Sequence, residues 1–494
     1  MEINDLTPAE RRVWQAFPFD EAVDFREDPD EDPVTGASWG PERTVRAEVL
    51  RALILGGPVR EGATAGLNLT GVRITGELYL KYGRSEHPLR MRGSWFEKTP
   101  VFYGAQLPTL VLTDSVLPGL DAPNIHLDLQ LRLSCARIAG QVKLSGARIA
   151  GGVFLNDAVF GPAGEDCAGD HTEPTALLLN HVSVGTDIRA KRLTVHGRTL
   201  LNATTVGGRV ILDDSRLLAP GGNALQAETL SVGTDLLARR LHAEGTCNLS
   251  STRIPGQLNF HRARLFAPDG TALRVSSAVL GELWLSRTAT VRGAVSLRRA
   301  QIDVLSVPPQ VWPDRVRLDG LTYRTLGPHV PAEDRLPLLA HDEAGYLPYA
   351  YEQLATAYRT AGDEAGARTV QLAKLRRHRR TLPRHARLWG LLQDATVGYG
   401  YRPMRAAGWL CALLLTGAVA FAVHTPPPLK PGEAPQFNPV FYTLDLLLPV
   451  IGFGQEAAFA PAGWQQWLSY LLIVTGWTLA TTILAGISRS LSRQ

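Results

Sequence analysis

The heptapeptide VSVGTDI at residues 182–188 returns as LSVGTDL at 230–236, and a diverged copy, AVLGELW, follows at 278–284. The three copies share glycines that lie 48 residues apart: Gly185, Gly233 and Gly281. Such self-similarity at a fixed period indicates one supersecondary unit that is stacked repeatedly. The fold is therefore a repeat architecture over much of the chain.

Shorter units lie inside the long period. ARIAGQVKL at 136–144 recurs as ARIAGGVFL at 147–155, and the turn LAPGGNAL at 218–225 matches FAPDGTAL at 266–273. Apolar residues alternate with period two, and units of about 11–12 residues end at glycine, which predicts one short strand and one turn per unit. Two units would form a coil of about 22–24 residues, so that 48 residues make two coils. The chain is predicted to be mainly β, with a parallel β-solenoid. A β-sandwich is the alternative, but its strands would not repeat at a fixed step.

The remaining sequence predicts four parts of the chain. Residues 1–65 form an N-terminal acidic segment with capping helices, because open solenoid ends need caps. Residues 66–325 form the solenoid. Residues 326–405 form an α-helical hairpin that serves as a connector and ends in a basic segment. Residues 406–494 form a two-span membrane hairpin.

Two uncharged apolar runs, 406–423 and 467–488, predict the membrane spans, since about 20 apolar residues cross the hydrocarbon core. Basic residues flank the two runs, whereas the connecting residues 424–466 contain one lysine. Basic residues next to a membrane span stay on the cytoplasmic side. We therefore expect an inner-membrane protein with both termini in the cytoplasm and residues 424–466 on the outer side of the membrane. Gly476 and Ala480 would allow the second helix to approach a neighbour closely.

A basic run precedes the first apolar run. Its position next to a predicted span indicates contact with anionic lipid at the cytoplasmic face, whereas no nucleic-acid partner is expected. The residues predicted to contact lipid are Lys374, Arg376, Arg377, Arg379, Arg380, Arg384, Arg387, Arg402 and Arg405.

Four stretches of the chain carry a resemblance to a known family: MEINDLTPAERRVWQAF (1–17), WGPERTVRAEVLRAL (39–53), GYGYRPMRAAGWL (398–410) and FYTLDLLLPVIGFGQE (441–456). The chain resembles a bacterial family of pentapeptide-repeat-like membrane proteins that have a solenoid, a helical hairpin and two C-terminal transmembrane helices. The resemblance implies a right-handed β-helix. Members are often labelled membrane-associated oxidoreductase. The label implies a redox activity, but the family offers no catalytic motif that can be carried over to residues of this chain.

Catalytic motifs are missing from the sequence. It contains no G-x-G-x-x-G between strand and helix, no C-x-x-C and no H-E-x-x-H, so no cofactor, no metal and no catalytic residue is predicted. Eight acids in residues 20–32 are expected to form a solvated acidic loop. An insertion at 165–174 contains one cysteine and one histidine, a thin ligand set that favours an exposed loop over a metal site.

The pentapeptide TVGYG at 396–400 matches a potassium-channel filter, but it precedes the first predicted span and cannot occupy the loop between two spans. Residues 438–456 have the right topology. They would form either a re-entrant helix with a filter-like turn or, as we favour, an amphipathic helix on the outer surface. The candidate filter-like residues are Asp445, Val450, Ile451, Gly452, Phe453, Gly454 and Gln455.

Three functions remain open from the sequence. The first is a membrane-anchored cytoplasmic scaffold without catalysis, which self-associates or binds a protein partner through the solenoid. The second is an ion-channel-like protein with a degenerate filter-like loop. The third is the oxidoreductase that the family label implies.

Overall fold

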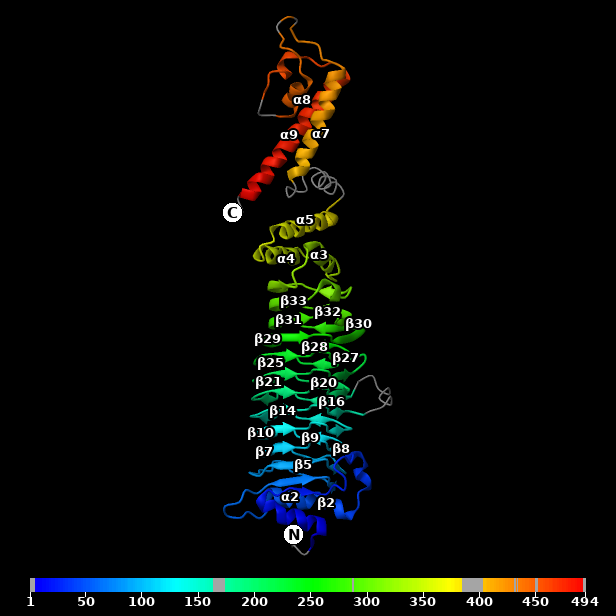
Figure 1. The fold of residues 1–494 in the computed structure, drawn as a ribbon, viewed down its shortest axis with the longest axis vertical. Helices are drawn as coiled ribbons and strands as arrows, with labels where there is room; N and C mark the ends of the chain where they lie inside the picture. The colour runs from blue at the N-terminus through cyan, green and yellow to red at the C-terminus, as the bar shows by residue number, and fades with distance from the viewer. Residues whose placement is uncertain are drawn as a thin grey trace. The chain divides into compact units, whose positions relative to one another are not determined.

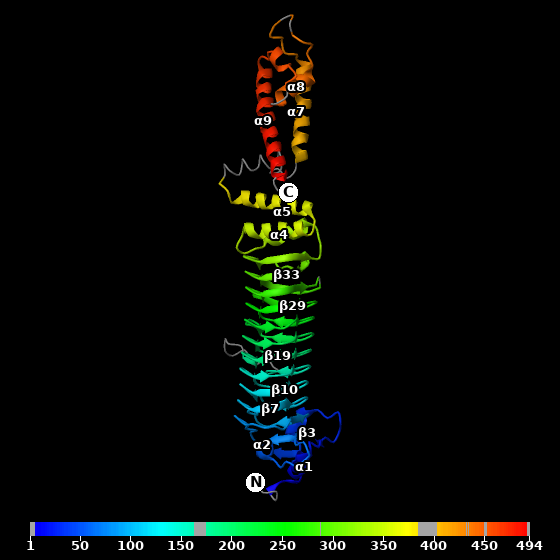
Figure 2. The same ribbon diagram turned by 90° about the vertical axis from the view of Figure 1, so that its left-hand side faces the viewer.

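A computed structural model describes residues 5–162, 174–286, 288–383, 403–430, 432, 434–448 and 452–491. The chain divides into two compact units, Met1–Gln353 and Leu354–Gln494, which are described separately. The first unit is a parallel β-solenoid of about 11 turns, as Figures 1 and 2 show. The predicted mainly-β solenoid is confirmed, and the β-sandwich alternative is wrong.

Each coil contributes short strands to two parallel sheets. In one coil, β17 (Ser183–Val184) and β18 (Ile188–Arg189) belong to sheet A, while β19 (Thr194–His196) and β20 (Arg198–Leu200) belong to sheet B. The described residues place 17 strands in sheet A, from β1 (Val23–Asp24) to β35 (Thr322–Gly327), and 18 in sheet B, from β2 (Thr44–Arg46) to β34 (Val316–Arg317). The coil therefore has two sides that meet at two corners, and each side bends between its two strands.

Shorter and longer coils alternate over residues 183–279, which explains the 48-residue period. The Asn202 N–H donates to the Asn180 side chain, 22 residues earlier, and the Glu228 N–H donates to the Asn202 side chain, 26 residues earlier. Strand pairs of sheet A alternate in the same way over these coils and the next two. In one of the longer coils, the additional residues form a loop between β23 (Arg216–Leu218) and β24 (Leu225–Gln226). This loop contains most of the repeated LAPGGNAL turn. Two coils therefore make one period, as the sequence predicted.

The corners of the coil are built from residues in the left-handed backbone conformation, few of which are glycine. His181, Arg192, Ala203 and Asp214 occupy successive corners with φ between 53° and 60°. A residue with a side chain costs about 1–2 kcal/mol in this backbone conformation. Backbone pairing between coils continues through the corner and offsets that cost: the His181 N–H donates to the Asn202 carbonyl at 2.8 Å.

The repeated glycines lie at bends within sheet A instead of at the ends of units, so this part of the sequence prediction was wrong. Gly185, Gly207 and Gly233 stack on one another in successive coils. A Cβ on Gly233 would lie 1.9 Å from the Gly207 carbonyl oxygen, and one on Gly207 would lie 2.3 Å from that of Gly185. Only glycine fits where backbones approach this closely.

Side chains that alternate along the strands fill the interior. Leucine, isoleucine and valine line the two inner faces, while small residues such as Ala136, Ala147 and Ala158 are fully buried beside the corners. Burial of apolar area contributes about 25 cal/mol per Å², so the stacked core is the main stabilising term. The outward positions are left to polar and charged residues.

Helices cover the N-terminal end of the stack. Helix α1 (Pro8–Ala16) begins with the capping box that Thr7 and Glu10 form, and α2 (Ala47–Gly56) buries Val49, Leu50, Leu53 and Ile54. The fully buried Glu10 carboxylate also binds the guanidinium of Arg46, with a closest N–O distance of 2.8 Å. Burial by itself would raise the pKa of Glu10, but hydrogen bonds from Arg46 and Thr7 outweigh it and lower the pKa to about 2.

The low pKa of Glu10 predicts an acid-sensitive cap. A lowered pKa stabilises the fold above the ordinary value of 4.5, and this contribution is lost as pH falls towards 2. We expect the melting temperature of Glu10→Gln to depend less on pH between 5 and 2.5 than that of the wild type. At pH 5 the free energy of unfolding of the variant should be lower than that of the wild type by about 2–3 kcal/mol. The control is Glu48→Gln, an exposed acid on α2. Parallel pH profiles for Glu10→Gln and the wild type would contradict the prediction.

Helices also follow the last coil. In α3 (Ala332–Ala340), the buried Arg335 donates to the carbonyls of Val307, Gly327 and Pro328 and so ties the helix to the final strands. The chain continues into α4 (Pro348–Thr360) and α5 (Glu364–Thr381). Gly362, with φ of 80°, turns the chain between α4 and α5.

Three helices near the C-terminus pack together within the second unit: α7 (Pro403–Val423), α8 (Pro439–Leu447) and α9 (Trp464–Leu491). Their core consists of Phe421, Tyr442, Leu446, Leu447, Phe459 and Leu472. Gly476 of α9 approaches α8 closely, because a Cβ there would lie 2.3 Å from the Leu447 carbonyl oxygen. The residues that the structure describes include no helix that is both long and apolar enough to cross a membrane.

Candidate functional site

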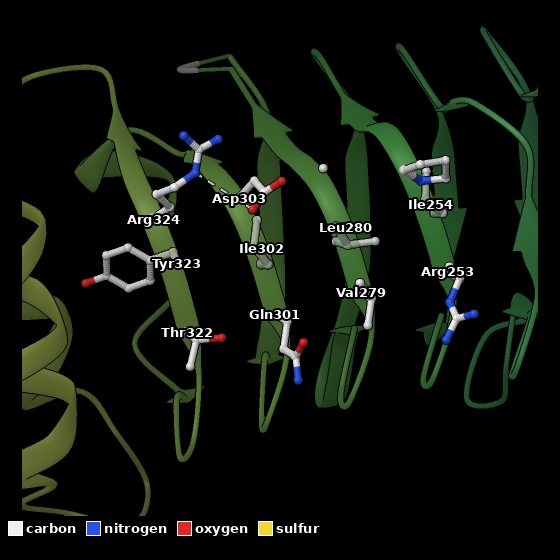
Figure 3. A pocket seen from close by; sticks show the side chains of 12 residues that line it. Arg253, Ile254, Val279, Leu280, Gln301, Ile302, Asp303, Thr322, Tyr323 and Arg324 are labelled. Atoms are coloured by element: carbon white, nitrogen blue, oxygen red, sulfur yellow. Dashed lines mark ion pairs between the residues drawn. The ribbon is translucent and has the colours of Figure 1, made fainter.

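A shallow groove of about 550–570 Å³ marks each sheet near the C-terminal end of the solenoid. On sheet A, the groove crosses β29 (Arg253–Phe260), β31 (Val279–Leu285), β33 (Gln301–Ser306) and β35. Figure 3 shows Arg253, Gln301 and Thr322 along one side and Asp303 and Arg324 on the other. Gly281, which has no side chain, takes the position on β31 that Asp303 takes on β33, and so leaves a gap on that side.

The groove on sheet A offers polar groups without a reactive constellation. Arg324 and Asp303 form a long ion pair, with 3.9 Å between Nε and Oδ1, and both side chains are about two-thirds exposed. Exposed pairs of this kind contribute little stability and remain available to a ligand. The arrangement can bind a polar surface, but it contains no nucleophile with an adjacent base.

Two cysteine thiols of the solenoid are poorly suited to redox chemistry. Burial, together with the neighbouring Asp157 carboxylate, raises the pKa of Cys135. Cys247 is fully buried, and burial raises its pKa to about 12. Both thiols are therefore protonated at neutral pH, and the thiolate is the reactive form. Cys167, like most of the 165–174 insertion, lies outside the described residues, among which no three potential metal ligands gather.

The candidate filter-like loop is organised by Asp445. The Asp445 carboxylate is buried on α8 and accepts backbone N–H groups from Phe453, Gln455 and Glu456, the last two at 2.7 and 3.0 Å. The Gln455 side chain is also buried and accepts from the Asn438 N–H at 3.2 Å. The predicted ionisable residue therefore has an evident structural role as an internal cap for the loop.

The other candidate loop residues are more open. Gly452 and Gly454 have no atoms near the position that a Cβ would occupy, and Phe453 is 44% exposed and contacts Phe441. Val450 and Ile451 lie outside the described residues, as does TVGYG at 396–400. Helix α8 packs against both α7 and α9, and the location of 438–456 relative to a bilayer stays a prediction.

The basic run is only partly described. Lys374, Arg376, Arg377, Arg379 and Arg380 lie on α5 and are half-buried or exposed. Arg384, Arg387 and Arg402 lie outside the described residues, and of Arg405 only the position in α7 is described. The predicted contact with anionic lipid stays a prediction.

Six of the eight acids at 20–32 are exposed, as a solvated loop predicts, but three acids of the segment also bind arginines elsewhere in the chain. Asp20 binds Arg90 at 2.6 Å, and Glu31 binds Arg43 at 2.8 Å. Asp32 binds Arg137, which lies 105 residues further along the chain, at 2.7 Å. Arg90 and Arg137 of the solenoid thus hold the acidic segment against the coils, because the stack brings distant outward positions into line.

Sequence reasoning missed this alignment of arginines, although a signal was present. Arg216 and Arg264 lie 48 residues apart, at the period of the repeat, and therefore occupy the same outward position two coils apart. Their place on sheet B is next to the second groove, which Arg216, Arg240, His242, Arg262, Arg264 and Thr288 line. No protein-family model, no curated protein and no solved structure matches the chain.

Proposed function

We propose that the chain is a membrane-anchored scaffold of the pentapeptide-repeat-like solenoid type, which binds a protein partner or a second copy through its solenoid. In this proposal the solenoid lies in the cytoplasm at the inner membrane, and α7 and α9 anchor it. Its action is recruitment or organisation, without bond chemistry. No feature of the described residues favours the channel or the oxidoreductase over the scaffold.

The observation that carries the membrane part is the exposure of large apolar side chains on α7 and α9. At least half of each side chain is exposed at ten positions: Trp409, Leu415, Val419, Val423, Trp464, Trp467, Tyr470, Leu471, Val474 and Trp477. Exposed large apolar side chains in this number indicate contact with a membrane or a partner. Lipid suits the composition, because tryptophan and tyrosine are enriched at membrane interfaces.

The apolar runs of the sequence also support an anchor. The run at 406–423 lies within α7, and the run at 467–488 lies within α9. The second run continues beyond Thr481, the last residue of α9 whose side chain the structure describes. Basic residues flank both runs, which supports cytoplasmic termini.

Vesicle flotation of the full-length chain tests the anchor. We expect the wild type to float with phosphatidylcholine–phosphatidylglycerol vesicles and to resist carbonate extraction. The variant Leu415→Lys/Val419→Lys/Val474→Lys should lose at least tenfold of its floating fraction, since each charge at the centre of a span costs about 2.5–3.5 kcal/mol. The control is Leu129→Lys, a change at an exposed leucine of the solenoid. Wild-type protein that is monodisperse without detergent and does not float would refute the anchor.

A further inference from the structure

One row of outward positions runs along sheet B through successive coils. We call it the sheet-B row and define it by strand pairing as Arg73, Trp95, Val116, Arg137, Val159, Thr194, Arg216, His242, Arg264 and Thr290. Paired positions in adjacent strands are about 4.8 Å apart. The row is therefore a regular track on the side of the stack.

The chain already uses the first part of this track to hold its own acidic segment. Residues 24–39, which we call the strap, contact the row at three points. Arg73 donates to the Trp39 carbonyl at 3.0 Å, and Gly36 packs so closely on Trp95 that a Cβ would lie 2.3 Å from the Trp95 Cβ. Arg137 donates to both carboxylate oxygens of Asp32, at 2.7 and 2.9 Å.

The later part of the row offers the same chemistry with no strap upon it. Arg216, His242 and Arg264 face outward beside the corner residues Arg240 and Arg262. Together with Thr288 they line a groove of about 550 Å³. Arg216, Arg262 and Arg264 are all exposed.

The charges in this groove do not balance. Asp214 binds Arg240, and Glu244 binds His242 at 2.8 Å. Within the described part of the chain, no carboxylate oxygen lies within 4.0 Å of the guanidinium nitrogens of Arg216, Arg262 or Arg264. Four arginines thus face two carboxylates, and the local surplus of positive charge would attract an anionic partner.

We propose that the groove at Arg216, Arg262 and Arg264 binds an acidic peptide segment of a partner protein, in the way that Arg137 binds the strap. The internal precedent identifies a carboxylate as the ligand group, since Arg137, Arg240 and His242 all contact one. Arginine suits this role because its planar guanidinium binds a carboxylate through two hydrogen bonds. The inference rests on the partner-binding part of the proposed function and names the chemistry of the partner.

Fluorescence anisotropy on the detergent-solubilised full-length chain tests the site. The probe is a labelled peptide with the sequence of the strap, DFREDPDEDPVTGASW (24–39), and the control peptide has asparagine and glutamine in place of its acids. We expect saturable binding of the acidic peptide that weakens as salt rises from about 50 to about 300 mM, because salt screens exposed charges. The variant Arg216→Ala/Arg264→Ala should weaken binding at least tenfold.

The matched control is Arg92→Ala/Arg148→Ala, which removes two exposed arginines from sheet A outside its groove and should change the affinity less than twofold. Equal loss in both variants would overturn the site, as would unchanged binding in Arg216→Ala/Arg264→Ala. Binding of pyrophosphate or single-stranded DNA in place of the peptide would overturn the ligand class. A concentration-dependent dimer that only Arg216→Ala/Arg264→Ala disrupts would identify a second copy as the occupant and refute the acidic partner. Vesicle flotation tests the membrane anchor alone, so its result does not depend on whether the groove binds the peptide.

Discussion

Gly233→Ala is expected to lower the melting temperature of the solenoid by about 5 °C, which corresponds to a loss of about 3 kcal/mol. The added methyl group would lie 1.9 Å from the Gly207 carbonyl oxygen and 2.6 Å from its carbonyl carbon. Both atoms are backbone atoms of the preceding coil, so the clash can be relieved only by separating two stacked coils. Since coils interact mainly with their neighbours, a single strained interface weakens the stack.

The control for this experiment is another glycine of the solenoid. Gly270 lies in the FAPDGTAL turn, where an added Cβ meets no atom within 4 Å and φ is not left-handed. Gly270→Ala should therefore leave the melting temperature within about 1 °C of the wild type. Thermal unfolding followed by circular dichroism measures both variants. Equal melting temperatures for Gly233→Ala and Gly270→Ala would show that the close stacking of glycines is not a constraint.

Asp445→Ala is expected to open the loop that follows α8. The substitution removes the acceptor for three backbone N–H groups, those of Phe453, Gln455 and Glu456. Hydrogen bonds to a charged group contribute about 1.5–3 kcal/mol each, so local opening should become easier by about 3 kcal/mol or more. Amide hydrogen exchange of residues 452–456 should then accelerate by about 100-fold.

Two further variants separate the role of the carboxylate from general effects of charge. Asp445→Asn keeps one acceptor oxygen and should give an intermediate rate. Glu456→Gln neutralises an exposed acid in the same loop and should exchange at the wild-type rate. Hydrogen exchange with mass spectrometry on the detergent-solubilised chain measures all three variants. A wild-type rate in Asp445→Ala would show that the loop is held by its apolar contacts alone.

Much of the solenoid could be predicted because its structural period appears as a repeat in the sequence. The 48-residue step of Gly185 and Gly233 fixes two coils, and alternation of apolar residues fixes which positions face the interior. The corners could not be predicted, because His181, Arg192 and Ala203 adopt the left-handed conformation although most side chains disfavour it. Pairing of their N–H groups with the next coil, a non-local effect, decides their conformation.

The candidate sites were harder to predict for a related reason. Asp445 was identified as a candidate ionisable residue, but its role depends on N–H groups eight to eleven residues away that only the folded loop brings together. Contacts of the strap, such as Asp32 with Arg137, join positions that are distant in the sequence. Composition gave no sign of these contacts, because Arg90 and Arg137 become neighbours of the acidic segment only in the stack.

The alternation of shorter and longer coils gives the stack a second use. Over residues 148–279, the residues that lengthen every second coil emerge at the same point, between β23 and β24 and again within β30 (Arg264–Arg274). The 165–174 insertion falls at the corresponding point, between β15 (Val159–Phe160) and β16 (Thr175–Leu178). Foreign peptides spliced into these loops would be displayed in a straight file with a pitch of about 9.6 Å, twice the spacing of strands.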